Sequence, residues 1–345
     1  MQVIDNLSQA NLSRPALVTV GAYDGIHIGH QHLLRRMATT ASEQGYASVV
    51  VTFYPRPQAV LLPHLPAQHL STPAEKIALL EQLGLDLVAM LPFTMELART
   101  SAAQFVRDML THLHMRELWV GPDFALGRNR EGSLPVLQQM GRDMGFEVRV
   151  IEPFSWEGEL VSSTRIRQLL AQGKVRQAAI LLGRYPSLSG LVASGAQRGR
   201  RVGFPTANIA VFPQLIIPAD GVYASFVWVN QLRHPAVTNI GVRPTFGAGE
   251  RTVESYLFNY NGDLYGMHVK LELVEYLRPE IRFGDVNMLA AQIQADIARA
   301  TDILGTSTPA TPPIAETGHE AQERGRATGE IPPSSQPGHA DERTA

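Results

Sequence analysis

A short apolar strand that runs directly into a glycine-rich turn most constrains the fold of this chain. Residues 17–20 (Leu-Val-Thr-Val) form the strand, and Gly21 and Gly25 open a turn that leads through His27-Ile28-Gly29-His30 into an amphipathic run. Glycine permits the backbone of a tight turn and the close approach of a ligand. The free N–H groups at the start of a helix attract anions. The stretch therefore predicts a phosphate-binding turn between a buried strand and a helix.

Residues 16–152 alternate short apolar runs with stretches of helical periodicity. Runs of Val and Leu separated by crossovers long enough for a helix indicate a mostly parallel sheet covered on both faces, that is, an α/β fold. Ligands bind to such sheets at the carboxyl ends of the strands, where the turn from Gly21 to His30 is expected. The predicted strands are 17–20, 48–53, 87–91, 118–121 and 146–151.

The second half of the chain has a different pattern. Residues 188–276 are rich in Gly, Pro, Val, Tyr and Phe and lack helical stretches, which favours a small antiparallel β-barrel. An amphipathic helix over 287–304 is expected to pack against it. Beyond it, Pro, Gly, Ser, Thr and charged residues predominate, which indicates disorder. We expect an α/β domain at 1–183, a barrel domain at 184–304 and a disordered tail at 305–345. The expected barrel strands are 190–194, 221–229, 235–240, 252–258 and 265–274.

Bulk composition excludes several classes of function. The 345 residues carry 30 Lys and Arg against 32 Asp and Glu, without a basic block, so the footprint of a nucleic-acid binder is missing. The absence of cysteine excludes disulfides, thiolate zinc sites and cysteine nucleophiles. No basic segment followed by an apolar one begins the chain, and no run of about 18 apolar residues occurs. We expect a cytoplasmic protein without a membrane span; its oligomeric state is open.

His27 and His30 are the first candidate catalytic residues. Three residues apart at the start of a helix, they are expected on one face. Two imidazoles directed at a nucleotide could stabilise charge that develops on a leaving pyrophosphate. The same spacing also fits a pair of partly buried structural histidines. Asp24 either caps the helix or orients a ligand.

A second helix start follows the fifth predicted strand. Ser162, Ser163 and Thr164 can cap a helix whose first turn contains Arg165 and Arg167. Cations are disfavoured at a helix N-terminus, so the arginines indicate a bound anion. Because they are two residues apart and point in different directions, we select Arg167.

The stretch 199–208 is the candidate site of the second half. Gly203 is one of the glycines that keep this loop open, and Thr206 and Asn208, two apart in an extended segment, project to the same face. Their hydroxyl and amide oxygens suit Mg²⁺ that bridges nucleotide phosphates. A turn followed by an edge strand explains the same pattern without a function. Glu254 lies on a predicted strand, where a lone glutamate usually faces solvent.

The chain contains no Walker A, dinucleotide-binding or nucleophile-elbow pattern. Its motifs resemble, in order and spacing over about residues 16–304, those of the prokaryotic bifunctional riboflavin kinase/FMN adenylyltransferases, also called FAD synthetases. The matching segments include VTVGAYDGIHIGHQ (18–31), VTFYPRP (51–57), VGPDFALGRNREG (120–132), VSSTRIR (161–167), LLGRYPSLSGLV (181–192), GRRVGFPTANI (199–209) and NIGVRPTFG (239–247).

This resemblance implies a Rossmann-like HxGH nucleotidyltransferase domain followed by a six-stranded riboflavin kinase barrel. The barrel would phosphorylate the ribityl 5′-hydroxyl of riboflavin from ATP. Thr206 and Asn208 match the family's magnesium and phosphate residues, and Glu254 matches its proposed general base. The first domain would join FMN to AMP from a second ATP, giving FAD and pyrophosphate, with the phosphate of FMN as nucleophile.

For adenylyl transfer the resemblance implies that His27, His30, Asp123, Ser163 and Arg167 hold the phosphates and adenosine of ATP, with His27, His30 and Arg167 acting on the reacting phosphates. The expected partners are therefore riboflavin, FMN and ATP, with Mg²⁺, and neither nucleic acid nor a membrane. Across both parts, ATP or phosphate binding is assigned to Gly21, Asp24, Gly29, Asp123, Ser163, Thr164, Gly203, Thr206 and Asn208.

Several positions depart from the family pattern, and the ones that bear on adenylyl transfer are Ala22, Pro122 and Leu126. They motivate an alternative, a riboflavin kinase with weak or lost adenylyltransferase activity. A second alternative is a non-catalytic flavin-binding protein that keeps only the fold. The His-Ile-Gly-His motif also occurs in class I aminoacyl-tRNA synthetases, but the chain lacks their Lys-Met-Ser-Lys-Ser-like loop and a basic RNA-binding surface.

Overall fold

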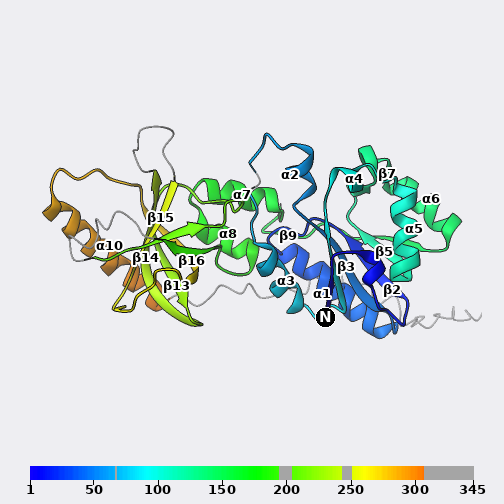
Figure 1. Ribbon diagram of the computed structural model, residues 1–345, viewed down its shortest axis with the longest axis horizontal. Helices are drawn as coiled ribbons and strands as arrows, with labels where there is room; N and C mark the ends of the chain where they lie inside the picture. Colours follow the sequence, from blue (N-terminus) through cyan, green and yellow to red (C-terminus); the bar gives the residue numbers. More distant parts are fainter. Residues whose placement is uncertain (67, 194–203, 243–250, 307–345) are drawn as a thin grey trace, which may run out of the picture. The chain divides into compact units, whose positions relative to one another are not determined.

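Six parallel strands form the sheet of the N-terminal half, in the order β1-β4-β3-β2-β5-β8 (Figure 1). The computed structural model describes residues 1–66, 68–193, 204–242 and 251–306. All of these residues belong to one compact unit. The five predicted strands are confirmed, and the short edge strand β1 was missed. The strands are β1 (Gln2–Ile4), β2 (Ala16–Val20), β3 (Ala47–Tyr54), β4 (Leu87–Pro92), β5 (Met115–Val120) and β8 (Glu147–Val150).

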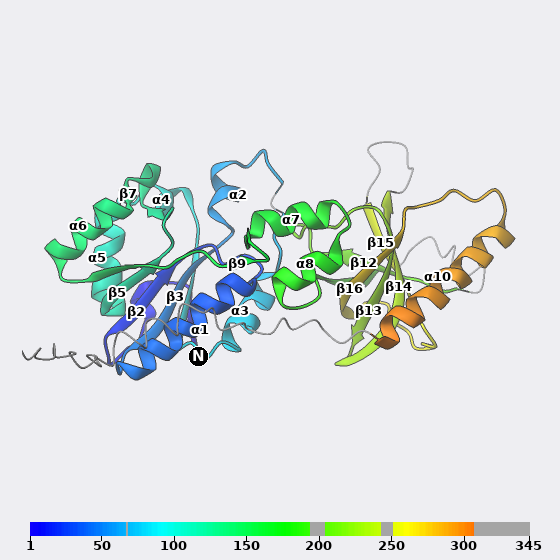
Figure 2. The same ribbon diagram turned by 180° about the vertical axis from the view of Figure 1, so that it is seen from behind.

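Successive residues of the central strands point to opposite faces of the sheet. On one face Leu17 and Val50 pack with Leu34 of α1 (Ile28–Glu43) and Leu80 of α3 (Pro73–Glu81). On the other face, neighbouring strand residues pack with α5 (Ala102–Leu113) and α6 (Leu134–Met144). Figure 2 shows the two layers from behind. The prediction of a sheet covered on both faces is therefore confirmed.

Strand β2 is the point at which the strand order reverses. It pairs with β3 on one side and with β5 on the other, so the loops that follow β2 and β5 diverge at the carboxyl edge of the sheet. Such a switch point creates the crevice where α/β folds bind ligands. The turn that begins at Gly21 lies at this crevice, as the sequence predicted.

Short elements complete the N-terminal half. Helices α7 and α8 lead from the sheet to the barrel, and Leu170 and Leu182 on them share a core with barrel residues such as Leu271. These elements are η1 (Leu7–Gln9), α2 (Pro57–Leu61), α4 (Met95–Ala98), β6 (Ala125–Leu126), η2 (Arg128–Arg130), β7 (Gly132–Ser133), β9 (Ser155–Trp156), β10 (Glu159–Leu160), α7 (Ser163–Ala171) and α8 (Val175–Leu182).

Six antiparallel strands close into a barrel in the second half, in the order β11-β12-β15-β14-β13-β16. Inward-facing residues such as Tyr223, Val227 and Ile240 fill its interior. The expectation of a small antiparallel barrel is confirmed. The strands are β11 (Ser187–Ala193), β12 (Ala207–Val211), β13 (Gly221–Val229), β14 (Leu232–Val242), β15 (Arg251–Leu257) and β16 (His268–Arg278).

Helix α10 (Val286–Thr306) lies against the outer face of the barrel, beside β13 and β14 (Figure 1). Ala300 and Leu304 pack on Val222 and Phe226, and the guanidinium of Arg278 on β16 donates to both carboxylate oxygens of Asp296. The helix runs two residues past its predicted end, and residues 307–345 lie outside the described part. No helix in the described ranges is long and apolar enough to cross a membrane.

Candidate active sites

The turn between β2 and α1 has an unusual backbone. Tyr23, Gly25 and Ile26 all have positive φ, at 43°, 79° and 39°. A side chain at Gly25 would meet Leu70 at 2.9 Å, so the packing as well as the backbone requires glycine. Left-handed residues so close together turn successive N–H groups into a concave anion-binding nest. This geometry supports the phosphate-binding turn predicted from the sequence.

His27 and His30 lie together at the start of α1. His27 is the N-cap, and its Nδ1 accepts the backbone N–H of His30 at 3.3 Å. The two imidazoles stack with ring centroids 3.5 Å apart and an interplanar angle of 19°. Their predicted position on one face is therefore confirmed. Because His27 caps the helix, the suggestion that Asp24 caps it is wrong.

Both imidazoles are neutral near pH 7. Burial lowers the pKa of His27 to about 4, and the positive charges of Arg184 and Arg167 oppose the effect of Asp24. Burial and the neighbouring His27 and Lys76 also lower the pKa of His30 well below its ordinary value. Since Nδ1 of His27 accepts a hydrogen bond, its proton is on Nε2, which can donate to an anion.

Two details fit a ligand at this pair. Nδ1 of His30 is buried and finds no hydrogen-bond partner among the described residues. Gly29 packs beside the His27 ring, because a Cβ there would lie 3.3 Å from its Nδ1. Gly29 therefore leaves space for the imidazole as well as for a ligand near the backbone.

The free energy of unfolding should fall as the pH is lowered from 7.5 to 4.5. The unfolded chain protonates His27 near pH 6.5, whereas the folded chain resists protonation until about pH 4. The stabilisation is thus present above the unfolded pKa and lost as the pH falls, by about 2 kcal/mol over this interval. Urea unfolding of the wild type and His27→Gln at both pH values checks this. Between pH 7.5 and 4.5 the free energy of unfolding of the variant should fall by about 2 kcal/mol less than that of the wild type. Parallel pH profiles for the two proteins would contradict the pKa of His27.

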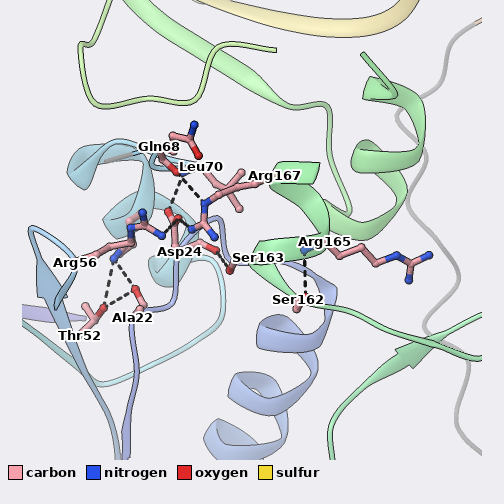
Figure 3. A network of polar contacts seen from close by, with 11 residues as sticks. Ala22, Asp24, Thr52, Arg56, Gln68, Leu70, Ser162, Ser163, Arg165 and Arg167 are labelled. Atoms are coloured by element: carbon pink, nitrogen blue, oxygen red, sulfur yellow. Dashed lines mark hydrogen bonds and ion pairs between the residues drawn. The ribbon is translucent and has the colours of Figure 1, made fainter. Parts of the chain in front are cut away.

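Asp24 is the electrostatic centre of the site. Only 2% exposed, its carboxylate accepts the N–H of Leu70 at 3.0 Å and pairs with Arg167 and, at 3.6 Å, with Arg56. Arg167 also donates to the carbonyl of Gln68 at 2.9 Å. Figure 3 shows these side chains converging from three segments of the chain. Asp24 thus fixes two guanidinium groups beside the turn.

The start of α7 docks on the same turn. Ser162 caps the helix by accepting the N–H of Arg165 at 3.2 Å, and the hydroxyl of Ser163 donates to the carbonyl of Asp24 at 2.9 Å. Arg165 pairs with Glu159 and points away from Asp24, whereas Arg167 points toward it (Figure 3). The choice of Arg167 agrees with this geometry.

A pocket of about 390 Å³ opens beside these residues, and Thr164, Arg167 and Arg56 are among those that line it. Arg56, in the segment after β3, was not selected from the sequence. The sequence offered one indication of a role for Arg56, its position in the segment VTFYPRP at the carboxyl end of a predicted strand. In this structure the anionic partner of Arg167 at the start of α7 is the carboxylate of Asp24, and Thr164 lines the adjoining pocket.

A larger cavity of about 660 Å³ lies at the carboxyl ends of the strands. Gly21 and the family departures Ala22 and Leu126 are on its wall. Apolar and aromatic side chains surround them, including Phe53, Pro57, Phe93, Phe105 and Phe124. A cavity of this size and composition suits a flat aromatic ligand.

Asp123 lies in the exposed turn after β5, where its carbonyl accepts Nη2 of Arg130 at 2.9 Å. No hydrogen bond or ion pair joins Asp123 to His27, His30 or Arg167 in the described part of the chain. The proposed ATP contact of Asp123 therefore stays a prediction.

The barrel brings together a second set of polar residues. Asn208 on β12 lies directly opposite Glu254 on β15, and Glu254 lies opposite Asn239 on β14. Directly opposed residues of antiparallel strands share a face, so the three form one row. Thr206, two residues before Asn208, belongs to the same face by alternation. Gly203 lies outside the described residues.

Asn239 was missed from the sequence, although it lies in the matched segment 239–247. Its amide donates to Glu280 at 2.8 Å. No cluster of three or more His, Asp or Glu that could bind a metal occurs in the described ranges. A cation at the barrel site would therefore depend on hydroxyl, amide and phosphate oxygens.

Comparison with known proteins identifies one family profile in each half of the chain. A FAD synthetase family profile matches residues 9–165 and a riboflavin kinase profile matches residues 182–304. The fold and these two profiles define a nucleotidyltransferase joined to a kinase barrel. The Escherichia coli K12 bifunctional riboflavin kinase/FMN adenylyltransferase is 35% identical over 309 residues, which cover 89% of this chain and 98% of that protein. The chain belongs to the bifunctional riboflavin kinase/FMN adenylyltransferase family.

Two further similarities concern a second member of the family and a solved structure of the same fold. The Pseudomonas fluorescens enzyme of the same description is 36% identical, over 85% of this chain and 94% of its own. A Streptococcus pneumoniae structure described as a macrolide-efflux protein superposes with a TM-score of 0.80 at 30% identity, covering 87% of this chain and 98% of its own. The enzyme thus phosphorylates riboflavin to FMN and adenylylates FMN to FAD.

Proposed function

We propose that the two reactions occur at the two sites described above, with separate residues for each. In the barrel, Glu254 accepts the proton of the ribityl 5′-hydroxyl while that oxygen attacks the γ-phosphorus of ATP, which releases ADP. Thr206 and Asn208 hold the phosphates. The observation that carries this assignment is the direct opposition of Asn208 and Glu254 across β12 and β15.

At the carboxyl edge of the sheet, a phosphate oxygen of FMN attacks the α-phosphorus of ATP, and pyrophosphate leaves. His27 and His30 donate to the departing phosphates, and Arg167 adds positive charge beside them. The flavin ring occupies the 660 Å³ apolar cavity. Neutral imidazoles, free N–H groups and the nearby guanidinium of Arg167 support this role, since the protein chiefly positions and neutralises charge.

Mg²⁺ fits the donor set at the barrel site, because Thr206 and Asn208 offer a hydroxyl and an amide oxygen and the bound phosphates would add further oxygen ligands. When bound, the ion would neutralise phosphate charge. Glu254 alternates with the buried Val253 and Ser255, so it lies on the face away from the barrel interior. We also propose a cytoplasmic location, with riboflavin, FMN and ATP as ligands and neither nucleic acid nor a membrane as partner.

A product assay tests the division of activities. Purified protein with ATP, Mg²⁺ and riboflavin should yield FMN and then FAD, resolved by chromatography over many turnovers. Accumulation of FMN without FAD would favour a kinase with lost adenylyltransferase activity, for which the positions of Ala22 and Leu126 on the cavity wall give a reason. Formation of neither product would contradict the proposal, and conversion limited to one equivalent would favour a non-catalytic flavin binder.

A further inference from the structure

The carbonyl groups of the phosphate-binding turn are held from behind by side chains. The carbonyl of Ala22 accepts Nζ of Lys76 at 2.8 Å and the hydroxyl of Thr52 at 3.1 Å. The carbonyl of Asp24 accepts the hydroxyl of Ser163 at 2.9 Å. Figure 3 shows Ala22, Thr52 and Asp24 beside one another at this turn. Donors from three segments thus fix the first half of the turn.

Arg184 fixes the second half. Its Nη2 donates to the carbonyl of Gly25 at 2.6 Å, and its Nη1 donates to the carbonyls of Ile26 and Leu182 at 3.3 and 3.2 Å. Gln31 adds a second donor to the carbonyl of Ile26 at 2.8 Å. The planar guanidinium therefore spans two consecutive peptide groups, which an ammonium group reproduces less well.

These bonds determine where the N–H groups point. In a trans peptide the carbonyl and the following N–H point in opposite directions. Because the carbonyls of residues 22, 24, 25 and 26 face the buried donors, the N–H groups of residues 23, 25, 26 and 27 face the other way. No protein acceptor for these four N–H groups is found within the described ranges. They are therefore available to an anion.

The two cations are unusual in their surroundings. Lys76 is 3% exposed, and its hydrogen bonds go to the neutral oxygens of Ala22 and Thr52. Burial lowers the pKa of Lys76 to about 8 and that of Arg184 to about 10. Glu75 and Asp24 act on Arg184, and Asp24 also acts on Lys76 but is already paired with Arg167 and Arg56. Two carboxylates therefore lie among four cations. Buried charge that exceeds the local carboxylate is costly, and an anionic ligand would offset that cost.

We propose that Lys76 and Arg184 are positioning residues for adenylyl transfer. They act through the turn: they hold its carbonyls back, direct its N–H groups at the phosphates of ATP, and raise the positive potential there without touching the nucleotide. The inference rests on the assignment of this turn to adenylyl transfer. Neither residue was identified from the sequence.

Lys76→Met is the first test, because it removes the ammonium and keeps the length of the side chain. With FMN and ATP supplied, kcat/KM for ATP should fall at least tenfold, and pyrophosphate should inhibit about tenfold less strongly. Riboflavin phosphorylation by the same protein should stay within about twofold of wild type. Lys76→Arg, which keeps a donor and the charge, should recover most of the lost kcat/KM. Lys174→Met, at an exposed lysine, is the matched control and should leave both activities unchanged.

Arg184→Lys is the second test and keeps the protein's charge. It should also lower kcat/KM for ATP at least tenfold, since one ammonium cannot span two peptide carbonyls. Arg176→Lys, on an exposed arginine of α8, is its control. If Lys76→Met fails to fold, this variant decides the question.

Two outcomes would overturn the inference. The first is wild-type adenylyl-transfer kinetics in a folded Lys76→Met or Arg184→Lys protein. The second is an equal loss of both activities with a lowered midpoint temperature of thermal unfolding. A merely structural role predicts that result. A wild-type enzyme that forms no FAD would instead contradict the assignment of adenylyl transfer to this chain.

Discussion

His30→Ala is expected to lower kcat for FAD formation from supplied FMN by about 100-fold or more, the range seen when one preorganised donor to a developing negative charge is removed. His30 stacks on His27 and meets the edge of Tyr23, with ring centroids 5.0 Å apart. The substitution therefore removes one donor and loosens the other. Riboflavin phosphorylation should stay within about twofold, because its residues lie on β12 and β15. Steady-state assays of each half-reaction measure both values.

The matched control for this variant is His112→Ala. His112 lies on the last turn of α5, outside the cavities that adjoin the phosphate-binding turn between β2 and α1. It should leave both activities near wild type. Thermal unfolding of His30→Ala should show a folded protein, since Tyr23 and the α1 core still pack around the void. An equal loss of both activities in folded His30→Ala would contradict separate sites.

Glu254→Gln is expected to have the opposite effect. Loss of a general base typically costs about 100- to 10,000-fold in rate, so FMN formation from riboflavin should fall by at least 100-fold. FAD formation from supplied FMN should remain within about twofold. The amide keeps the shape of the side chain, so the row with Asn208 and Asn239 is preserved. Initial rates with riboflavin and with FMN as separate substrates check this.

Glu275→Gln on β16 is the matched control, because Glu275 pairs with the exposed Arg176. It should leave riboflavin phosphorylation unchanged. A Glu254→Gln protein with normal kinase activity would show that another group accepts the hydroxyl proton. Glu280, which accepts a hydrogen bond from Asn239, would then be the next residue to substitute.

The fold was largely predictable because its determinants are local in sequence. The strands of the sheet are continuous runs of Val and Leu, and α1 has an apolar stripe that includes Leu34 and Met37. Strand β1 was missed because three residues are too few for a periodic pattern. The closure and strand order of the barrel depend on pairings such as β11 with β16. Those pairings join distant segments, so no local pattern predicts them, and the family resemblance implied only the number of strands.

The candidate site was predictable where one segment carries it and not where several segments converge. His27 and His30 follow from a single motif, and their stacking follows from helical spacing. The ion pair between Asp24 and Arg167 joins residues 143 positions apart, so no spacing rule could reveal it. Lys76 could have been noticed as a lysine four residues before the buried Leu80 on one helix face. Arg184 lies at the expected boundary between the two domains, where the sequence carries no recognisable site motif.

The central claim is that the two sites are independent and that FMN passes between them in free form. A mixing experiment with the two variants tests this claim most directly. His30→Ala alone should convert riboflavin to FMN and stop, and Glu254→Gln alone should leave riboflavin unchanged. Combined in one tube with ATP and Mg²⁺, the two proteins should convert riboflavin to FAD, because FMN released by the first is adenylylated by the second. Folded variants that each behave as stated yet form no FAD when mixed would contradict this account.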